Sequence, residues 1–295
     1  MRYSLRQLEV FLATARHENV TRAAAALAMS QSAASGALKE LEGQFNVQLF
    51  DRVGKRLQLS ELGHQLRPQA QSLLDQAREF EQALAGDNIL GRLEIGATLT
   101  IGNYLAVNMI ADFRQRNPQA DIALQIANTE VIAERVAGFE LDMGLVEGEY
   151  HHPDLEILHW RRDELVVFAA PDHPLATSRK VSDRQLIELP WIVRERGSGT
   201  RQAFDRAMHG IVTDLHIAME LQQPKAIKRA VEAGLGVGCL SRISVQEAFE
   251  RGSLVPLPVS GRDFHREWFI ITHRHKYRSA ALKQWLTLCI ERWSS

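Results

Sequence analysis

Residues 19–59 read NVTRAAAALAMSQSAASGALKELEGQFNVQLFDRVGKRLQL, and this stretch decides the architecture of the first part of the chain. Its pattern predicts a short helix over 22–27, a tight turn, a second helix and a basic hairpin. Thr21 and Ser30 are expected to cap the two helices, because an N-cap hydroxyl accepts from a backbone N–H two or three residues on. We therefore predict a helix-turn-helix, with an ordinary pair of antiparallel helices as the alternative.

The second helix of this stretch has one apolar and one polar face. Apolar side chains recur at helical spacing on the first face, which predicts that it is buried. These side chains are Ala34, Leu38, Leu41 and Phe45. The opposite face suits a helix that enters the DNA major groove, because its side chains are small or able to hydrogen-bond. These side chains are Gln31, Ser32, Ser35 and Lys39.

The hairpin that follows carries a local excess of positive charge. Gly54 provides the permissive backbone of its tip, and Arg52, Lys55 and Arg56 lie beside it. A basic wing of this kind suits contacts with phosphates, which provide affinity without sequence information. An amphipathic helix over 5–17 is expected to pack against the two helices.

The segment 5–63 resembles the winged helix-turn-helix of LysR-type transcriptional regulators, through its combination of SQSAAS, LE and LFDR. The resemblance implies that double-stranded DNA, as an inverted-repeat operator, is the partner. It also implies that Gln31, Ser32 and Ser35 face the DNA and that Arg52 holds its backbone. Gly36 departs from the pattern, because many members carry an arginine there. The remaining expected DNA-binding residues are Thr21, Arg22, Ser30, Lys39, Lys55 and Arg56.

The whole chain has the size and composition of a protein with roughly two domains of about 100–200 residues. Its 295 residues are 45% hydrophobic and 24% charged, and the net charge of −1 gives no overall indication of nucleic-acid binding. Local charge is more informative, because residues 1–60 contain eight Lys/Arg and five Asp/Glu. Two distant cysteines do not form a disulfide framework, and no apolar run suits a membrane span or signal core. A cytoplasmic protein without membrane contact is expected.

A long helix capped by Ser60 is predicted to run to about residue 85. It has an apolar stripe but no core of its own, so the stripe is expected to meet a second copy. Pro68 is expected to kink or break the helix near 64–68. The family's dimerising linker, here 61–88, fits this helix, and a homodimer or homotetramer is expected. The stripe comprises Leu62, Leu66, Leu73, Ala77, Phe80 and Leu84.

From Gly91 onward strands alternate with helices, which predicts an α/β fold with mostly parallel sheets. Separate strands are expected over 155–160 and 164–170. The resemblance implies a two-subdomain fold like that of type 2 periplasmic solute-binding proteins. Subdomain I would comprise 91–161 and 267–295, and subdomain II 162–266. The expected whole is an all-α winged helix-turn-helix over 1–60, the linker helix, and an α/β effector-binding domain over 91–295.

Three loop-to-helix junctions of this α/β region, at 96–102, 128–130 and 197–201, lie where strands end and helices begin. Each offers hydroxyls and backbone N–H groups. Simple helix capping is the alternative for each junction, but three junctions on both sides of a predicted cleft favour a ligand. The expected effector is a small anion, either a carboxylate metabolite or an oxyanion of the sulfate or sulfite kind. The expected effector-binding residues are Thr98, Leu99, Thr100, Asn128, Thr129, Glu147, Arg194, Ser198, Gly199, Thr200 and Arg201.

Three of these residues have a specific expected role. Arg194, Arg201 or, between them, Arg196 is expected to add a charge-assisted contact. Glu147 is expected either to reject excess negative charge or to bind a cationic group.

An enzyme and a stand-alone solute receptor are the alternatives to a regulator. Ser198 lacks the full Gly-x-Ser-x-Gly context of a nucleophile, and Cys239 is expected to be a buried structural thiol. The histidines at 151–152 and at 273 and 275 lack metal-ligand spacing. We expect no catalytic residue, metal or cofactor. The predicted function is a transcription regulator whose operator binding or activation is controlled by the effector, with RNA polymerase as a further partner if it activates.

Overall fold

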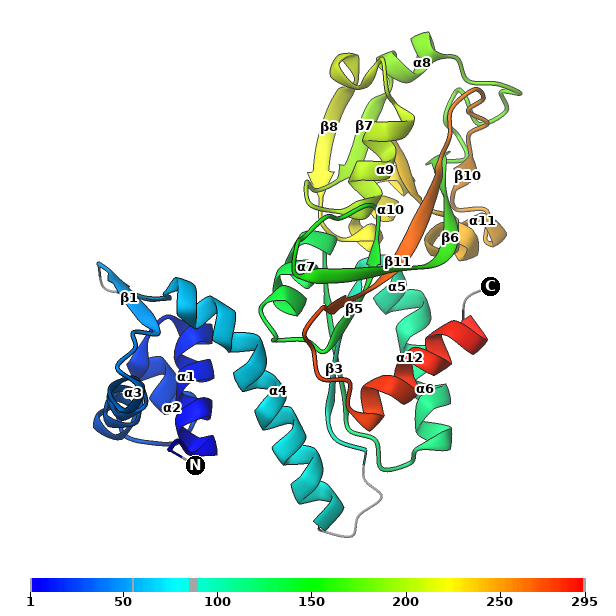
Figure 1. The fold of residues 1–295 in the computed structure, drawn as a ribbon. Coiled ribbons are helices and arrows are strands. Elements are labelled where there is room, and N and C mark those ends of the chain that lie inside the picture. Colours follow the sequence, from blue (N-terminus) through cyan, green and yellow to red (C-terminus); the bar gives the residue numbers. More distant parts are fainter. Residues whose placement is uncertain (1, 55, 85–89, 294–295) are drawn as a thin grey trace. The chain divides into compact units, whose positions relative to one another are not determined.

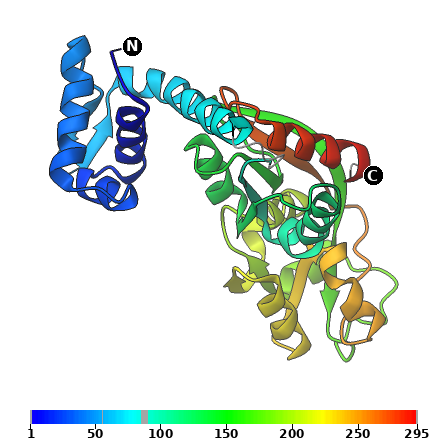
Figure 2. The same cartoon turned by 90° about the horizontal axis from the view of Figure 1, so that it is seen from below.

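The structure is a computed structural model and describes residues 2–54, 56–84 and 90–293. Lys55 and the expected end of the linker helix, 85–88, lie outside the described residues. The chain divides into two compact units, which Figures 1 and 2 show from two directions. The first unit is Met1–Gly91 with Arg274–Lys283, and the second is Arg92–His273 with Gln284–Ser295.

The first unit begins with three helices and a hairpin. The strands β1 and β2 pair antiparallel, and Gly54 between them has a φ of 63°, which glycine adopts without a Cβ penalty. The predicted winged helix-turn-helix is confirmed (Figure 1). Its elements are α1 (Leu5–His17), α2 (Val20–Ala26), α3 (Gln31–Phe45), β1 (Phe50–Val53) and β2 (Arg56–Leu59).

Side-chain caps set the starts of α2 and α3. Ser30 caps α3 as predicted, because its Oγ accepts from the N–H of Ala33 at 3.2 Å. The prediction that Thr21 caps α2 is wrong. Asn19 is the cap, with its Oδ1 accepting from the N–H of Arg22 at 3.0 Å, so Thr21 lies within the first turn.

An apolar core joins α1, α3, the hairpin and the long helix α4 (Glu61–Leu84). Ala34, Leu38 and Leu41 of α3 are buried in it, as predicted. Phe45 is 44% exposed, so its predicted burial is wrong. It ends α3 at the rim of the core, where its ring centroid lies 6.4 Å from that of Tyr3.

The helix α4 runs without interruption through Pro68, so of the predicted kink or break near 64–68 the break is wrong, and the kink stays a prediction. Ser60 caps it as predicted, because its Oγ accepts from the N–H of Gly63 at 3.0 Å. An interior proline costs about 3 kcal/mol, and apolar burial along the same helix offsets that cost. The α4 side chains that pack into the core are Leu62, Leu66, Ala70 and Leu74.

The segment Arg274–Lys283 belongs to the first unit and contacts α4 through polar groups. Lys276 Nζ donates to Asp75 Oδ2 at 2.9 Å, and Tyr277 OH donates to Glu79 Oε2 at 2.5 Å. The helix α12 (Ala280–Trp293) begins in this segment and continues into the second unit.

The second unit is built on a sheet whose described strands follow the order β4-β3-β5-β11-β6-β9-β7-β8, with β10 paired to β6. The strands β3 and β7 pair in parallel with both neighbours, whereas β6 and β11 are antiparallel to theirs. The predicted α/β fold is confirmed, but the expectation of mostly parallel pairing is wrong: among the described strands of this sheet, four pairs are parallel and four antiparallel. The strands are β3 (Leu93–Thr98), β4 (Ile122–Ala127), β5 (Met143–Glu147), β6 (Leu155–Ala169), β7 (Pro190–Arg194), β8 (His216–Leu221), β9 (Val237–Ser241), β10 (Val255–Pro256) and β11 (His265–His273).

Helices connect these strands. None of the helices in the described ranges is long and apolar enough to cross a membrane. The helical elements are α5 (Leu99–Ile101), the π-helix η1 (Gly102–Ala106), α6 (Val107–Arg116), α7 (Thr129–Ala137), α8 (Asp183–Glu188), α9 (Gly199–Ala207), the 3-10 helix η2 (Val212–Asp214), α10 (Pro224–Glu232), α11 (Arg242–Glu250) and α12.

The strand β6 is continuous, so the prediction of two strands over 155–160 and 164–170 is wrong. Its first part pairs with β11 and its last part with β9. Four charged residues, 161–164, interrupt the apolar pattern on which the prediction rested. Together β6 and β11 connect the first half of the sheet (β3, β4 and β5) to the second half (β7, β8 and β9), as Figure 1 shows.

We expect Gly36→Ala and Gly43→Ala to stabilise the first unit by up to about 1 kcal/mol each, because alanine favours the helix over glycine. A Cβ at either position of α3 would meet no heavy atom within 4 Å. Urea-induced unfolding followed by circular dichroism measures the change.

The control is Gly63→Ala in α4. A Cβ at Gly63 would lie 2.2 Å from the Leu49 carbonyl oxygen, so this change should destabilise the unit by about 1–3 kcal/mol. Equal effects at all three glycines would contradict the account.

Candidate functional site

The polar face of α3 is open to solvent. Gln31, Ser32 and Lys39 are exposed, and Ser35 is half-buried. The hydroxyls of Ser30 and Ser32 lie 3.0 Å apart at the start of the helix. The face therefore presents hydrogen-bonding groups on a rigid helix.

Thr21 and Arg22 are exposed in the first turn of α2, and the wing adds Arg52 and Arg56 in exposed positions. The Arg56 guanidinium lies 3.5 Å from the Glu18 carboxylate, an exposed pair that constrains it little. Lys55, expected to bind phosphate, lies outside the described residues.

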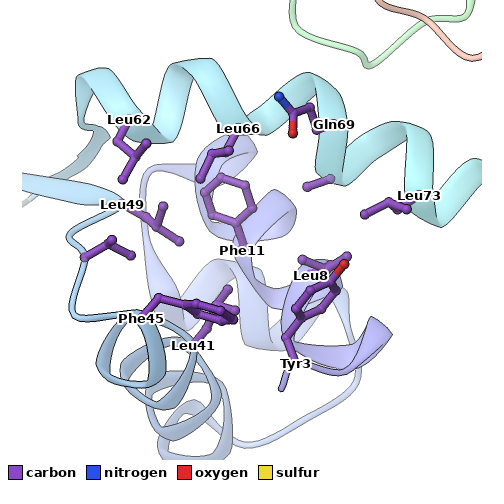
Figure 3. A pocket seen from close by; sticks show the side chains of 12 residues that line it. Tyr3, Leu8, Phe11, Leu41, Phe45, Leu49, Leu62, Leu66, Gln69 and Leu73 are labelled. Atoms are coloured by element: carbon purple, nitrogen blue, oxygen red, sulfur yellow. The ribbon is translucent and has the colours of Figure 1, made fainter. Parts of the chain in front are cut away.

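An apolar groove of about 370 Å³ lies between α1, α3 and α4. Figure 3 shows Leu62, Leu66 and Leu73 of α4 on one side of the groove and Tyr3, Leu8, Phe11, Leu41 and Phe45 on the other. Leu73 is 41% exposed, and Phe80 and Leu84 further along α4 are 64% and 71% exposed. The predicted apolar stripe of α4 is thus buried at its start and uncovered at its end.

The second unit contains a buried polar cluster centred on Glu147, the last residue of β5. Arg266 Nη1 donates to Glu147 Oε2 at 2.7 Å and to Thr200 Oγ1 at 2.9 Å. Thr200 in turn donates to the same Glu147 oxygen at 3.3 Å. The Glu147 and Arg266 side chains are each 1% exposed, so their pairing takes place away from water.

Asp163 of β6 is the second carboxylate of the cluster. Arg266 Nε donates to Asp163 Oδ2 at 2.7 Å, and Ser241 Oγ donates to Asp163 Oδ1 at 2.8 Å. Burial alone would lower the pKa of the Arg266 guanidinium, but Glu147 and Asp163 raise it above the ordinary value. Arg266 is therefore a fixed cation between two carboxylates.

Glu147 stays ionised in this setting. Burial alone would raise the pKa of its carboxyl, but the charge of Arg266, the Thr100 hydroxyl and the charge of Arg194 outweigh burial. The pKa of Glu147 is held below its ordinary value as a result. Thr98 also faces this carboxylate and contributes in the same direction.

Within the described part of the chain, Thr98 Oγ1, Glu147 Oε1 and Arg266 Nη2 have no hydrogen-bond partner within 3.5 Å, although the Thr98 hydroxyl lies close enough to the Glu147 carboxylate to lower its pKa. Buried polar atoms are usually paired, and an unpaired one costs about 1–3 kcal/mol. Thr98 stands at the N-cap position of α5 but makes no side-chain cap. The simple capping alternative therefore does not account for Thr98.

The other two junctions do contain caps. Asn128 Oδ1 accepts from the N–H of Val131 at 3.0 Å, and Ser198 Oγ accepts from the N–H of Thr200 at 3.2 Å. Thr129 instead donates to the Glu147 carbonyl oxygen at 2.8 Å. Capping and contact with the cluster therefore coexist at these junctions.

The two halves of the sheet meet at these loops. A Cβ at Gly199 would lie 2.0 Å from the Glu147 carbonyl oxygen, so only glycine allows α9 to start against the end of β5. The Glu149 N–H donates to Gln202 Oε1 at 2.9 Å. Tyr104 OH donates to the Ser244 carbonyl oxygen at 3.2 Å, which bridges the halves a second time.

The predicted arginines are engaged elsewhere. Arg194, 2% exposed, pairs through two nitrogens with Glu195 at 2.8 and 3.0 Å. Arg201 donates to Asp205 at 2.9 Å and to Glu220 at 2.8 Å. Arg201 thus makes its ion pairs outside the cluster, whereas Arg194 acts on Glu147 through its charge.

A groove of about 650 Å³ opens beside the cluster, where α7 and α9 begin. Among the predicted residues it brings together Thr129, Ser198, Gly199 and Arg201. Thr98, Leu99, Thr100, Glu147 and Thr200 are buried instead, and Asn128 is half-buried. The predicted residues therefore lie either in the groove or in the buried cluster. The two regions meet at the carbonyl oxygen of Glu147, which Thr129 and Gly199 contact.

The residues that the structure describes support neither of two other kinds of site, a cysteine nucleophile and a metal site. Burial raises the pKa of both cysteine thiols, Cys239 and Cys289, which makes them poor nucleophiles. No group of three or more His, Cys, Asp or Glu side chains suited to a metal ion occurs among the described residues.

Comparison with known proteins identifies the family. The description "LysR substrate binding domain" matches residues 86–294, and "Bacterial regulatory helix-turn-helix protein, lysR family" matches residues 5–64. The chain belongs to the LysR family. It is a DNA-binding transcription regulator with an effector-binding domain, and not an enzyme.

Relatives of this LysR-type regulator match it along most of its length. Escherichia coli K-12 YeiE, described as an uncharacterized HTH-type transcriptional regulator, is 45% identical over 293 residues, 98% of each chain. A full-length OxyR variant from Pseudomonas aeruginosa has the same fold, with a TM-score of 0.74 at 22% identity over 99% of this chain and 94% of that one. The CcmR regulatory domain of Synechocystis PCC6803, in complex with 2-PG, has a TM-score of 0.64 at 27% identity, covering 70% of this chain and all of that one.

Sequence reasoning about this LysR-type regulator missed Arg266 and Asp163. Both residues lie on strands that pair antiparallel, with Arg266 opposite Asp163 in register. Charged residues of both signs in the two strands were the available indication, but the pairing of Arg266 with Asp163 depends on the sheet register, which joins positions about a hundred residues apart in the sequence.

We expect Arg266→Met to destabilise the second unit by about 3–5 kcal/mol, because Glu147 and Asp163 lose their shared cation while remaining buried. Burial, no longer outweighed by the charge of Arg266, then raises the pKa of the Glu147 carboxyl above its unfolded value, so stability present at low pH is lost as pH rises. The deficit should be larger at pH 7 than at pH 5 when urea-induced unfolding is measured at both.

Arg162→Met on the same strand pair is the control. The Arg162 side chain is 80% exposed and lies 3.1 Å from Glu267, so its loss should cost less than about 1 kcal/mol. A deficit for Arg266→Met no larger than that of Arg162→Met would refute the structural role of the buried arginine.

Proposed function

We propose that this regulator binds an inverted-repeat operator as a homodimer or homotetramer and that a small anion in the cleft between its subdomains controls operator binding or activation. The anion is a carboxylate metabolite or an oxyanion of the sulfate or sulfite kind. The observation that carries this proposal is the buried cluster around Glu147, in which hydroxyls and a guanidinium already hold a carboxylate oxygen.

The proposed boundaries follow the sheet. The DNA-binding domain spans 1–60, the linker helix 61–88 and the effector-binding domain 91–295. Within the last, subdomain I comprises 91–161 and 267–295, and subdomain II comprises 162–266. The contacts of Glu147 with residues from β7–α9 and β11 support a ligand position between the halves.

The hydrogen-bond donors gathered around Glu147 support an anion as the effector. Arg266 and Arg194 both act on the site, and the hydroxyls of Thr98 and Thr100 face the same carboxylate. Donors aimed at one point in a water-excluded site stabilise negative charge there. The CcmR domain in complex with 2-PG supports a small molecule as effector.

The exposed polar face of α3 and the arginines of the wing support the DNA contacts. Gln31, Ser32 and Ser35 would read base edges from the start of the helix, while Arg52 and Arg56 would hold phosphates. Gly36 adds no side chain to this surface, so the helix reads fewer bases than an arginine there would allow. We propose a cytoplasmic location because the protein acts on DNA, with RNA polymerase as a further partner if it activates.

The uncovered end of the α4 stripe supports self-association. Leu73, Phe80 and Leu84 lie at helical spacing on α4 and are exposed. Leu73 also lines the apolar groove of the first unit, so the groove and the exposed end of the stripe share this residue. A second copy of α4 offers the matching apolar surface. Light scattering of the free chain tests this, and a monomer at micromolar concentration would contradict it.

A motion of the two subdomains relative to each other would couple anion binding to operator binding. The strands β6 and β11 continue from one half of the sheet into the other. An anion can change the closure of the halves only if its affinity differs between the open and closed states. The loop contacts Tyr104–Ser244 and Glu149–Gln202 are the ones that such a motion would make and break.

Arg52→Ala is expected to weaken binding to operator and to unrelated DNA alike, because a phosphate contact carries no sequence information. The slope of log affinity against log salt should fall by about one. Gel-shift titration at several salt concentrations measures both quantities. Arg184→Ala, which removes a 91% exposed arginine of the second unit, is the control and should change neither. An unchanged salt slope in Arg52→Ala would remove the wing from the DNA contacts.

Isothermal titration of the full chain with a panel of carboxylates and inorganic oxyanions should detect anion binding. Thr98→Val removes one unpaired hydroxyl at nearly constant volume, and a hydrogen bond to a charged group contributes about 1.5–3 kcal/mol, so affinity should fall at least about tenfold. Thr14→Val removes a similarly buried unpaired hydroxyl from the first unit and should leave affinity unchanged. Binding of amines or apolar compounds, and of no anion, would refute the proposed effector class.

A further inference from the structure

The groove beside the buried cluster is lined from both halves of the sheet. The first half contributes the start of α7 and the loop after β5, and the second half contributes the loop before α9 and part of α9 itself. Among the described residues that line the groove, none belongs to the centre of the cluster, which is Thr98, Glu147 and Arg266. Its volume of about 650 Å³ is typical of small-molecule sites. The groove therefore has room for a ligand of its own.

Five charged side chains among the described residues line this groove, and three of them have ionic partners on the protein. Arg201 donates to Asp205 at 2.9 Å and to Glu220 at 2.8 Å. The Glu149 carboxylate lies 3.6 Å from the Arg206 guanidinium. The charges of the lining residues Arg201, Asp205 and Glu149 are thus compensated by neighbouring side chains.

The other two charged residues of the groove, Glu130 and Arg196, have no such compensation. Both are exposed, and neither side chain makes an ion pair or a hydrogen bond with any residue that the structure describes. A Cβ at Gly197 would lie 2.4 Å from Glu130 Oε2, so the Glu130 carboxylate rests against the residue that follows Arg196. An acidic and a basic side chain therefore share one groove without pairing with each other.

The two charges belong to opposite halves of the sheet. Glu130 lies in the first turn of α7, and Glu149 from the loop after β5 adds a second carboxylate on the same half. Arg196 precedes Ser198, the N-cap of α9, where the helix dipole also favours negative charge. The groove thus has an acidic side on the first half and a basic side on the second.

A ligand with a single kind of charge fits this groove poorly. A simple anion facing Arg196 approaches the carboxylates of Glu130 and Glu149. A simple cation facing Glu130 approaches the guanidiniums of Arg196 and Arg201. A ligand that carries both charges meets an opposite charge at each end, and charge complementarity of this kind selects a partner against molecules of one sign.

We propose that the groove is a second ligand site and that it binds a small zwitterion, with an ammonium group facing Glu130 and a carboxylate facing Arg196. A free amino acid and a short peptide share this chemistry. The inference goes beyond the proposed function, which rests on the buried cluster, so each stands if the other fails. Because the two ends of the ligand contact different halves of the sheet, its binding favours the arrangement in which the halves are close.

Isothermal titration of the full chain with alanine, dialanine and trialanine tests the proposal, each compared with its N-acetylated and its C-amidated form. Acetylation removes the ammonium charge, and amidation removes the carboxylate charge. At least one zwitterion should bind at least about fivefold more tightly than both of its capped forms. That ratio is the upper end for an exposed ion pair, and the groove shields the contacts from solvent. The preferred length distinguishes an amino acid from a peptide.

Two neutral variants assign the ends of the ligand. In Glu130→Gln the zwitterion and its N-acetylated form should bind within about twofold of each other, while the preference over the amidated form remains. In Arg196→Gln the opposite preference should be lost. Glu188→Gln and Arg184→Gln on α8, whose side chains are 65% and 91% exposed, are the matched controls and should keep the parent pattern. Circular dichroism confirms that each variant is folded.

Three results would overturn the inference. The first is that no zwitterion binds, and the second is that a capped form binds as tightly as its zwitterion. The third is the parent pattern in both Glu130→Gln and Arg196→Gln, which would remove these side chains from the site. Binding of sulfate or of simple carboxylates to the parent chain, without binding of any zwitterion, would overturn this second site and leave the proposed anion effector standing.

Discussion

The ion pair between Arg266 and Glu147 is the contact on which the effector domain depends. A charge buried without a partner costs several kcal/mol, so each of these residues requires the other. The pair and its neighbour Asp163 join β5, β6 and β11 at the centre of the sheet. Because the same carboxylate receives the Thr200 hydroxyl at the start of α9, this single polar cluster also aligns the loops that line the cleft.

The two units use opposite chemistry for their binding surfaces. The second unit keeps charged groups away from water, where donors and acceptors are strong and selective. The first unit exposes apolar side chains such as Phe80 and Leu84 on α4, where area and shape determine association. The proposed anion site and the proposed self-association surface therefore use different residues of the chain.

Sequence patterns predicted correctly those helices and turns that are set by residues close by in the chain. The helix of α7 begins after Asn128 and the helix of α3 after Ser30, because in both a side chain next to the helix pairs an orphan N–H. The hairpin at Gly54 follows from backbone freedom at one residue. Errors arose where contacts far along the chain compete with the local pattern. Apolar burial carries α4 through Pro68, and pairing with β11 and β9 keeps β6 continuous through its charged middle.

The sequence by itself determined the family, the helix-turn-helix, the wing and the junction residues Thr98, Thr129 and Ser198, because each depends on residues close together in the chain. Only the tertiary structure decided which of them share a site. Arg266 meets Glu147 across more than a hundred residues, through strand register and the close approach that Gly199 allows. The unpaired atoms beside that contact follow from three-dimensional geometry, since hydrogen-bond partners are counted in space and not along the sequence.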